Sequence, residues 1–178
     1  MTRGSRIRTL GLLLVCGAGL VAAGARGAPP PPAPADAQEV EVAGVVVHPE
    51  TRQPAVVLQG KRDRRTFAMV IGPAEATGIA LPLRHVTPPR PLTHDLFLTL
   101  FGRLNVRVTK VVVTDLRDDI YYAIVFLQAG SGEMELDARP SDAIALAIRA
   151  GAPIHVEARV FDKSERLAPA PGGPVPRI

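Results

Sequence analysis

The sequence predicts an α+β fold, in which one compact domain packs mixed β-sheet against helices. Two observations lead to this class. Segments in which apolar and polar residues alternate are interspersed with segments of helical spacing. The order of three strands followed by one helix also occurs twice along the chain. The part that carries these patterns, residues 39–163, is long enough to bury its own core.

The first half of this domain holds three expected strands and one helix. Valine is frequent in residues 40–47, which we expect to form the first strand. Residues 55–59 and 66–71 are expected to form a hairpin whose loop is residues 60–65. A short helix over residues 73–81 should follow, because proline at position 73 fits the first turn of a helix.

The second half repeats this order after an additional helix. Residues 94–104 predict that helix, since their large apolar side chains share one stripe at helical spacing. Residues 106–114 and 120–128 predict two strands, and residues 133–138 alternate in the manner of a third. Residues 140–150 predict a helix with little polar surface beyond its first turn. Alternation over residues 154–160 predicts a final strand.

A weak internal repeat accompanies this order. Pro73-Ala74-Glu75-Ala76 resembles Pro140-Ser141-Asp142-Ala143, and each segment follows a third strand. We interpret the match as a duplicated unit of three strands plus a helix.

Both ends of the chain differ in composition from the domain. Residues 1–25 have three early arginines, an apolar stretch and small residues at Ala23-Gly24-Ala25, which together are typical of a secretory signal peptide. An uncleaved anchor is the alternative, although the apolar stretch is short for a membrane span. Residues 26–38 predict a proline-rich linker, and residues 164–178 a tail rich in proline and glycine. We therefore expect a periplasmic or secreted protein with no membrane span in its mature chain.

Charge and cysteine content exclude several classes of function. Residues 39–163 contain 15 basic and 15 acidic residues, so the pI of 9.8 reflects the ends of the chain and does not indicate a nucleic-acid-binding surface. Cys16 is the only cysteine and lies in the expected signal peptide. The mature chain therefore has neither a disulfide bond nor a cysteine metal site.

Two polar junctions, each placed just before an apolar helix, are the candidate functional residues. One is Asp137-Ala138-Arg139-Pro140-Ser141-Asp142, and the other is Arg90-Pro91-Leu92-Thr93-His94-Asp95. The carboxylates of Asp137, Asp142 and Asp95, together with Glu75, are hard oxygen ligands suited to Mg²⁺ or Mn²⁺. We predict Asp137 and Asp142 as the metal ligands.

The same junctions offer groups for acid–base chemistry and for phosphate binding. His94 could act as a base or as a ligand. Arg139 could grip a phosphate with two donors, with Ser141 and Arg90 as further phosphate contacts near a helix N-terminus. We predict Asp137, Arg139, Asp142, His94 and Asp95 as the catalytic set.

Each of these residues also has a purely structural interpretation. Glu75, Asp95 and Asp142 lie in the first turns of expected helices, where a carboxylate offsets the helix dipole, and Thr93 is a plausible N-cap. Arg139 could pair with Asp137 or Asp142, and His94 could be a packing histidine. The basic loop 61–65 could contact phosphates or could be an ordinary solvated hairpin tip.

The chain resembles the bifunctional nuclease (BFN) domain family. The resemblance rests on Arg90 to Leu96, Tyr122-Ala123, and Asp137 to Ala147, in that order, and on Ile71 to Ala76 and Pro153-Ile154. It extends over about residues 45–162. It implies a compact α+β fold, frequent oligomerisation, and an ability of some members to degrade both DNA and RNA.

Two hypotheses follow from these patterns. The first is an exported, metal-assisted nuclease of low sequence selectivity that acts on DNA and RNA and forms a homo-oligomer. The second is a non-catalytic binding or assembly module of the cell envelope, in which the polar junctions only cap helices. The two hypotheses differ in whether the junctions converge in space.

Overall fold

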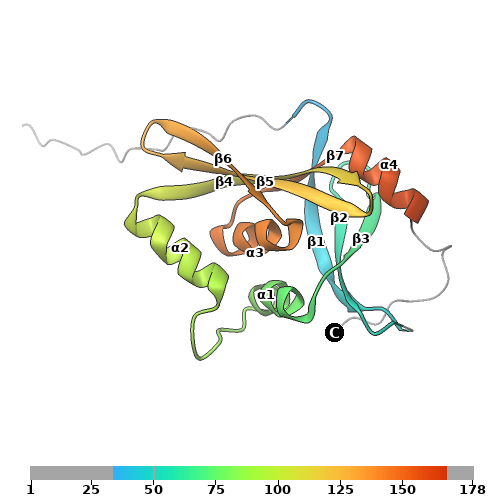
Figure 1. Ribbon diagram of the computed structural model, residues 1–178, viewed down its shortest axis with the longest axis horizontal. Helices are drawn as coiled ribbons and strands as arrows, with labels where there is room; N and C mark the ends of the chain where they lie inside the picture. The colour runs from blue at the N-terminus through green and yellow to red at the C-terminus, as the bar shows by residue number, and fades with distance from the viewer. Residues whose placement is uncertain (1–33, 50, 168–178) are drawn as a thin grey trace, which may run out of the picture.

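A single mixed sheet of seven strands, with four helices, forms the part of the chain that the computed structural model describes, residues 34–49 and 51–167 (Figure 1). The elements in chain order are β1 (Ala37–Val47), β2 (Pro54–Gly60), β3 (Thr66–Val70), α1 (Pro73–Leu83), α2 (Thr93–Arg103), β4 (Val106–Arg117), β5 (Ile120–Ala129), β6 (Gly132–Ala138), α3 (Pro140–Ala150), β7 (Ile154–Glu157) and α4 (Ala158–Leu167). The predicted α+β class is confirmed.

The sheet has the strand order β3-β2-β1-β7-β4-β5-β6. Two antiparallel three-strand units, β1–β3 and β4–β6, therefore lie on either side of β7. Strand β7 runs antiparallel to β1 and parallel to β4. Each three-strand unit leads into a helix that begins with proline, α1 after β3 and α3 after β6. The expected order of three strands and a helix is thus present twice, within one sheet.

The core lies between the sheet and helix α3. Ala143, Ile144, Ala145, Leu146 and Ala147 are all buried in α3, because alanines on several sides allow neighbouring elements to approach closely. They share one hydrophobic cluster with alternate residues of β4 and β5. Burying a side chain the size of Ile144 stabilises the fold by roughly 1.5–3 kcal/mol. Helices α1, α2 and α3 lie together beneath this part of the sheet (Figure 1).

The prediction of a final strand over residues 154–160 is wrong in its second half. Strand β7 ends at Glu157 and helix α4 begins at Ala158. Val160, Phe161 and Ser164 are buried, and their spacing places all three on one helix face, whereas a strand would point Val160 and Phe161 to opposite faces. On this helix face the Phe161 ring lies edge-on against Phe67, with centroids 5.1 Å apart.

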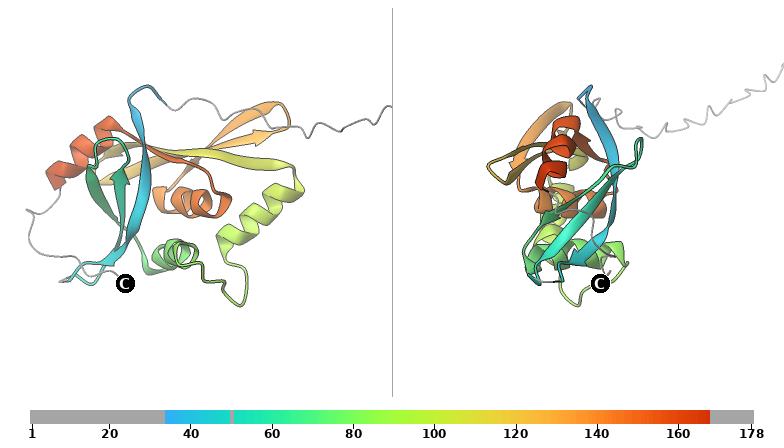
Figure 2. Two further views of the ribbon diagram at one scale, coloured as in Figure 1. Left: turned by 180° about the vertical axis from the view of Figure 1, so that it is seen from behind. Right: turned by 90° about the vertical axis from the view of Figure 1, so that its right-hand side faces the viewer.

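Helix α4 also closes one end of the sheet, as both views in Figure 2 show. The Lys163 ammonium donates to Asp115 Oδ1 at 2.6 Å and to the Leu116 carbonyl at 3.0 Å, and Tyr121 Oη lies 3.1 Å from Ser164 Oγ. The folded part therefore continues to Leu167, past the boundary expected at residue 163.

The predicted signal peptide, most of the proline-rich linker and residues 168–178 of the tail lie outside the described residues. Within residues 34–49 and 51–167, no helix is both long enough and apolar enough to cross a membrane.

Candidate functional site

The two polar junctions meet in space. His94, in the first turn of α2, places its Nε2 atom 3.3 Å from Oδ1 of Asp142, in the first turn of α3. The two residues are 48 positions apart in the sequence. The contact arises because α2 packs across α3 while both helices begin on the same side of the molecule.

Arg139 lies between two carboxylates. Its Nε and Nη2 atoms donate to Asp142 at 2.6 and 3.1 Å, and its Nη1 atom donates to Oε1 of Glu75 at 2.9 Å. The side chain of Arg139 is 65% exposed, whereas those of Asp142 and Glu75 are 33% and 20% exposed. Solvent can therefore reach the guanidinium more easily than the carboxylates beneath it.

The internal repeat explains this pair of carboxylates. Pro73 and Pro140 each occupy the first position of a helix, and Glu75 and Asp142 each follow two residues later. Because α1 and α3 pack against each other, the two equivalent acids reach the same guanidinium. We refer to Glu75, His94, Arg139 and Asp142 as the junction cluster.

Gly72 allows Glu75 to adopt its position. A Cβ atom added to Gly72 would lie 2.3 Å from Oε2 of Glu75, a distance that real Cβ atoms do not tolerate. Glu75 therefore folds back over the start of its own helix, and only glycine leaves room for it there.

The surroundings of Asp142 stabilise its ionised form. Burial by itself would raise the pKa of Asp142, but hydrogen bonds from Arg139 and His94 outweigh this effect and lower the pKa. The same hydrogen bond to Asp142, with a further one to Glu75, raises the pKa of Arg139. Asp142 is thus a permanent anion at neutral pH.

The His94 side chain packs closely against helix α1. Its side chain is 13% exposed, and its Nδ1 atom is buried without a hydrogen-bond partner. A Cβ atom added to Gly78 would lie 3.1 Å from Cε1 and 3.3 Å from Nδ1 of His94. Nε2, the atom that contacts Asp142, is therefore the ring nitrogen that faces the rest of the cluster.

A second ion pair lies beside the junction cluster. Arg149 Nε donates to Oδ1 of Asp95 at 2.7 Å, and Arg149 Nη1 donates to the carbonyls of Gly78 and Ala145 at 2.6 and 3.0 Å. The Arg149 side chain is only 8% exposed. This pair ties the start of α2 to α1 and to the last turn of α3.

Asp95 also caps its own helix. Its Oδ2 atom accepts the Leu92 backbone N–H at 2.8 Å, and Leu92, rather than the expected Thr93, is the N-cap residue. Burial would raise the pKa of Asp95, but the hydrogen bonds from Arg149 and Leu92 lower it. The structural interpretation of Asp95 therefore accounts for both of its oxygens.

The other predicted site residues lie apart from this cluster. Asp137 pairs with Ile124 across β6 and β5. Its neighbours Leu136 and Ala138 pair with Val125 and Ala123 of the core cluster, so alternation directs Asp137 to the sheet face opposite α3. Structure therefore separates Asp137 from Asp142.

The predicted phosphate contacts have different environments. Ser141 is buried, at 7% exposure, in the first turn of α3. Arg90 is exposed in the loop between α1 and α2. Of the three, Arg139 has both the exposure and the position to meet an anion at the junction cluster.

Sequence analysis missed two residues that hold the site together, Gly78 and Arg149. Arg149 had a detectable signal, since it is the only charged residue beyond the first turn of the apolar helix α3. Gly78 had a weaker one, as a glycine within a helix costs stability unless close contact requires it.

The charges of the site are mutually compensated. Arg139 and Arg149 face three carboxylates, from Glu75, Asp142 and Asp95. A phosphodiester approaching this surface finds no excess of positive charge. It must either attract Arg139 away from its carboxylates or arrive with a cation.

The donors present suit a hard divalent cation only in part. Glu75 and Asp142 are oxygen donors, and Mg²⁺ commonly takes one or two carboxylates with its remaining positions filled by water and substrate phosphate. Residues 34–49 and 51–167 contain no group of three or more acidic, histidine or cysteine side chains arranged to hold a metal.

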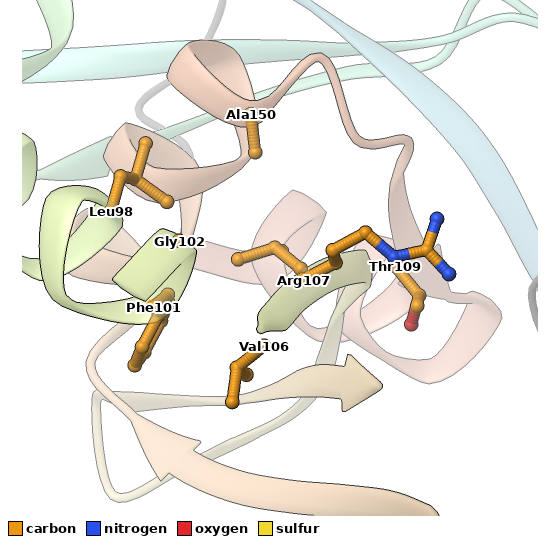
Figure 3. A pocket seen from close by; sticks show the side chains of 8 residues that line it. Leu98, Phe101, Gly102, Val106, Arg107, Thr109 and Ala150 are labelled. Carbon is orange, nitrogen blue, oxygen red and sulfur yellow. The ribbon is translucent and has the colours of Figure 1, made fainter. Parts of the chain in front are cut away.

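Two hollows flank helix α2. One, of about 450 Å³, lies between α2, β4 and the end of α3 and includes Leu98, Phe101 and Arg107 (Figure 3). The other, of about 500 Å³, is lined by the loop between α1 and α2 and reaches Asp95 and Arg149. Neither hollow is lined by a member of the junction cluster.

The basic hairpin loop is held by ion pairs with the rest of the domain. Lys61 pairs with Glu39, Arg64 with Glu41, and Arg65 with Asp162. These contacts favour the interpretation of residues 61–65 as a solvated hairpin tip.

Comparisons with known proteins agree with the resemblance. A model of the bifunctional nuclease domain matches residues 56–168. The uncharacterized protein Rv1829 of Mycobacterium tuberculosis is 37% identical over 131 residues, which are 74% of this chain and 78% of that protein. Bifunctional nuclease 1 of Oryza sativa subsp. indica and the bifunctional nuclease of Oryza minuta are each 35% identical over 81 residues, 44% of this chain and 24% of each plant protein.

Proposed function

From the premise that this chain belongs to the bifunctional nuclease domain family, we propose that it is a nuclease that hydrolyses phosphodiester bonds of DNA and RNA. The names of the plant relatives, which match less than half of this chain, support this proposal. The observation that carries it is the junction cluster, where an exposed arginine lies between two carboxylates and a histidine.

Each member of the cluster has a chemical role in this proposal. Arg139 binds a non-bridging phosphate oxygen, since a guanidinium presents paired donors that match a phosphate. As Arg139 turns toward the substrate, Glu75 and Asp142 lose their shared cation. His94 keeps its hydrogen bond to Asp142 and holds that carboxylate in place after Arg139 has turned, so His94 is a positioning residue.

Once Arg139 binds the phosphate, the two carboxylates of Glu75 and Asp142 have no shared cation, and this favours a divalent cation such as Mg²⁺ or Mn²⁺ that assists hydrolysis. Glu75 and Asp142 would hold it, with Glu75 in place of the Asp137 that the sequence suggested. Such a cation lowers the pKa of bound water and neutralises charge on the phosphate. The residues of the chain itself bind the phosphate and orient it, and hydrogen bonds from Arg139 and His94 lower the pKa of Asp142.

Low sequence selectivity fits the kind of groups on this surface. Contacts to phosphate position a nucleic acid without distinguishing its bases. Cations already lie against two rings of the sheet, Arg117 over Tyr122 at 4.0 Å and Lys110 over Phe126 at 4.4 Å. Within the described residues these rings are not open platforms for stacking bases.

Export to the periplasm or the medium is part of the same proposal and rests on residues 1–25 alone. Mass spectrometry of the protein secreted or released from cells would test it. Recovery of the mature N-terminus near residue 25 supports export, whereas an intact N-terminus in a soluble intracellular fraction contradicts it.

The decisive experiment is cleavage of fluorescent single-stranded DNA and RNA by the purified protein, with and without EDTA and then with added Mg²⁺ or Mn²⁺. Arg139→Ala and Asp142→Asn should each reduce cleavage at least a hundredfold. Arg62→Ala is the matched control, because Arg62 is an exposed arginine in the hairpin loop. Equal cleavage by the folded variants and the wild type would exclude the junction cluster as the catalytic site.

One observation favours the alternative of a non-catalytic binding or assembly module. The three carboxylates that converge, those of Glu75, Asp95 and Asp142, each already have an arginine partner, as expected of residues that only cap and tie helices. Absence of cleavage under all metal conditions, together with a large loss of stability in Asp142→Asn, would support this second function.

A further inference from the structure

We propose that the second hollow beside helix α2, which we call the loop hollow, binds one nucleobase of a nucleic-acid strand and prefers guanine to adenine. The hollow is lined by the end of α1, by the loop between α1 and α2, and by Asp95 and Arg149. This inference deepens the proposed function and rests on it, since the strand is the one whose phosphate lies at the junction cluster. A buried arginine, apolar walls and the position of the hollow carry it.

Arg149 presents one nitrogen atom to the loop hollow. Its side chain is 8% exposed, its Nε atom donates to Asp95, and its Nη1 atom donates to the carbonyls of Gly78 and Ala145. Among the described residues Nη2 has no hydrogen-bond acceptor, yet it is not one of the polar atoms that are sealed from solvent without a partner. Because Arg149 lines the hollow, we infer that the N–H groups of Nη2 open onto it and are free for a ligand.

The charge of Arg149 is already balanced. Oδ1 of Asp95 accepts Arg149 Nε at 2.7 Å, and Oδ2 accepts the backbone N–H of Leu92 at 2.8 Å. Nη2 is therefore a donor that carries no surplus charge into an apolar hollow. A donor of this kind suits the oxygen or nitrogen acceptors on the edge of a nucleobase.

The walls of the loop hollow are apolar and fixed by the backbone. They include the side chains of Leu81, Pro82, Val86, Pro88 and Pro91. Helix α1 ends in two hydrogen bonds, from the His85 N–H to the Pro82 carbonyl at 3.1 Å and from the Val86 N–H to the Leu81 carbonyl at 3.0 Å, and the prolines restrict the loop that follows. The volume, about 500 Å³, lies within the range of roughly 300–1,000 Å³ that small-molecule sites occupy.

His85 offers an aromatic face at the rim. It is exposed, lines the hollow and has a φ of 55°, a left-handed conformation that residues other than glycine seldom adopt. This position, just after the last turn of a helix, is the one that glycine most often occupies. Imidazole rings are among the side chains on which unpaired bases stack. A histidine at a position suited to glycine therefore agrees with a role of its ring in holding a base.

The loop hollow lies next to the junction cluster. Gly78 connects the two, because its carbonyl accepts Arg149 Nη1 at 2.6 Å and a Cβ atom at Gly78 would lie 3.1 Å from Cε1 of His94. In addition, Asp95 of the hollow directly follows His94 of the cluster in sequence. A strand whose phosphate lies at the cluster can therefore place a neighbouring base in the hollow.

The rim of the loop hollow is basic. Arg84 and Arg90 are exposed beside the lining residues His85 and Pro91, and residues 76–94 contain no acidic residue. The loop extends away from the sheet and is thus accessible to a large ligand (Figure 1). An apolar hollow with a basic rim suits a nucleotide, whose base is flat and apolar on its faces and whose phosphate is an anion.

Guanine matches Nη2 better than adenine does. Guanine presents two adjacent acceptors, O6 and N7, and an arginine or lysine donor to these atoms is the commonest base-specific contact in protein–DNA complexes. Adenine presents an N6 donor in place of O6, which would oppose the N–H groups of Arg149. The preference concerns this one base, since contacts to phosphate elsewhere on the strand do not distinguish bases.

Titration of the purified protein with guanosine monophosphate (GMP), adenosine monophosphate (AMP) and inorganic phosphate, followed by NMR, tests the site. GMP should shift the amide signals of Val86 and Thr87 and the Nε–H signal of Arg149, and it should bind about tenfold more tightly than AMP. Inorganic phosphate should leave the Val86 and Thr87 signals in place.

Val86→Glu should weaken GMP binding about tenfold or more, because its carboxylate enters the hollow and repels the phosphate. Val70→Glu is the matched control, since Val70 is likewise an exposed valine, at 63% compared with 49% for Val86, and lies on β3 outside the hollow. Equal affinity for GMP and AMP, or GMP binding that Val86→Glu leaves unchanged, would overturn the proposal. Shifts of Val86 caused by octanoate but by neither nucleotide would identify an organic acid as the occupant and would also overturn it.

Cleavage of two single-stranded oligonucleotides that differ only in one guanine or adenine separates this inference from the proposed function. Faster cleavage beside guanine, lost in Val86→Glu, supports both. GMP binding at Val86 without any cleavage would support the loop hollow as a nucleotide site and contradict the nuclease. Cleavage that is insensitive to the base, with no GMP binding, would leave the nuclease in place and overturn the loop hollow.

Discussion

Substituting Gly78 by alanine should displace the His94 side chain and thereby break its contact with Asp142, which joins the two junctions. The added methyl group would lie 3.1 Å from His94 Cε1 and 3.3 Å from Nδ1. Distances in this range are shorter than nine in ten real Cβ contacts. His94 cannot move freely, because its side chain is only 13% exposed and lies between Gly78 of α1 and Asp142 at the start of α3.

The expected change in stability combines two opposing effects. Glycine to alanine within a helix ordinarily stabilises a protein by up to about 1 kcal/mol. Inserting a methyl group into a packed contact costs about 1–3 kcal/mol. We therefore expect Gly78→Ala to lower the free energy of unfolding by up to about 2 kcal/mol, which corresponds to a fall in Tm of up to about 6 °C.

Gly102→Ala is the matched control. Gly102 also lies in a helix, α2, but is exposed, and a Cβ atom there would meet nothing within 4 Å. This substitution should raise stability by roughly 0.5–1 kcal/mol. The opposite signs of the two effects isolate the contact with His94 from the general helix preference of alanine.

Thermal unfolding, the NMR signals of the His94 ring and the cleavage assay form the set of measurements. Gly78→Ala should shift the His94 signals and reduce cleavage, whereas Gly102→Ala should leave both unchanged. If Gly78→Ala raised Tm as much as Gly102→Ala and left the His94 signals in place, the close contact would not constrain the site and the reasoning would be refuted.

Three other predictions concern the ion pairs and the core. Replacing Arg149 by methionine should destabilise the protein by roughly 2–3 kcal/mol, since it leaves the partly buried Asp95 without its cation. Urea unfolding of this variant, of Asp95→Asn and of the double variant measures the coupling free energy between the two residues. If the pair acts as a unit, all three variants should lose the same free energy of unfolding. Because the pKa values of Asp95 and Asp142 are lowered in the folded protein, the unfolded state takes up protons first as the pH falls. Their contribution to stability is therefore complete at neutral pH and is lost as the pH falls through about 4 and below. Urea midpoints from pH 7 to pH 3 should show this fall, and an Asp142→Asn variant whose midpoint depends on pH as steeply as that of the wild type would contradict it. Phe161→Ala should lower the free energy of unfolding by about 3–5 kcal/mol, because Phe161 is 1% exposed and its removal leaves a cavity under α4. A decrease below about 1 kcal/mol in thermal unfolding would show that α4 does not close the core.

Local patterns predicted most elements because their causes are local. Proline and an acid at the start of α1 and α3, and the alternation of apolar and acidic residues in β6, specify these elements without reference to the rest of the chain. The exception is the segment after β7. Ala158 to Val160 fit a strand by alternation, yet the helix α4 buries Val160 and Phe161 together. Phe161 there packs against Phe67, which is far away in sequence.

The site shows the same division. Residue chemistry alone singled out Arg139, Asp142 and His94, since dense polar groups before apolar helices need a capping or functional explanation. The sequence likewise determined that Glu75 and Asp142 occupy equivalent helix positions. Only the packing of α1 against α3 decided that both carboxylates share one guanidinium, and only the alternation of β6 within the sheet placed Asp137 on the opposite face. A one-dimensional pattern specifies which groups a segment carries, whereas the direction of each side chain and its neighbours are set by contacts between segments that the pattern does not contain.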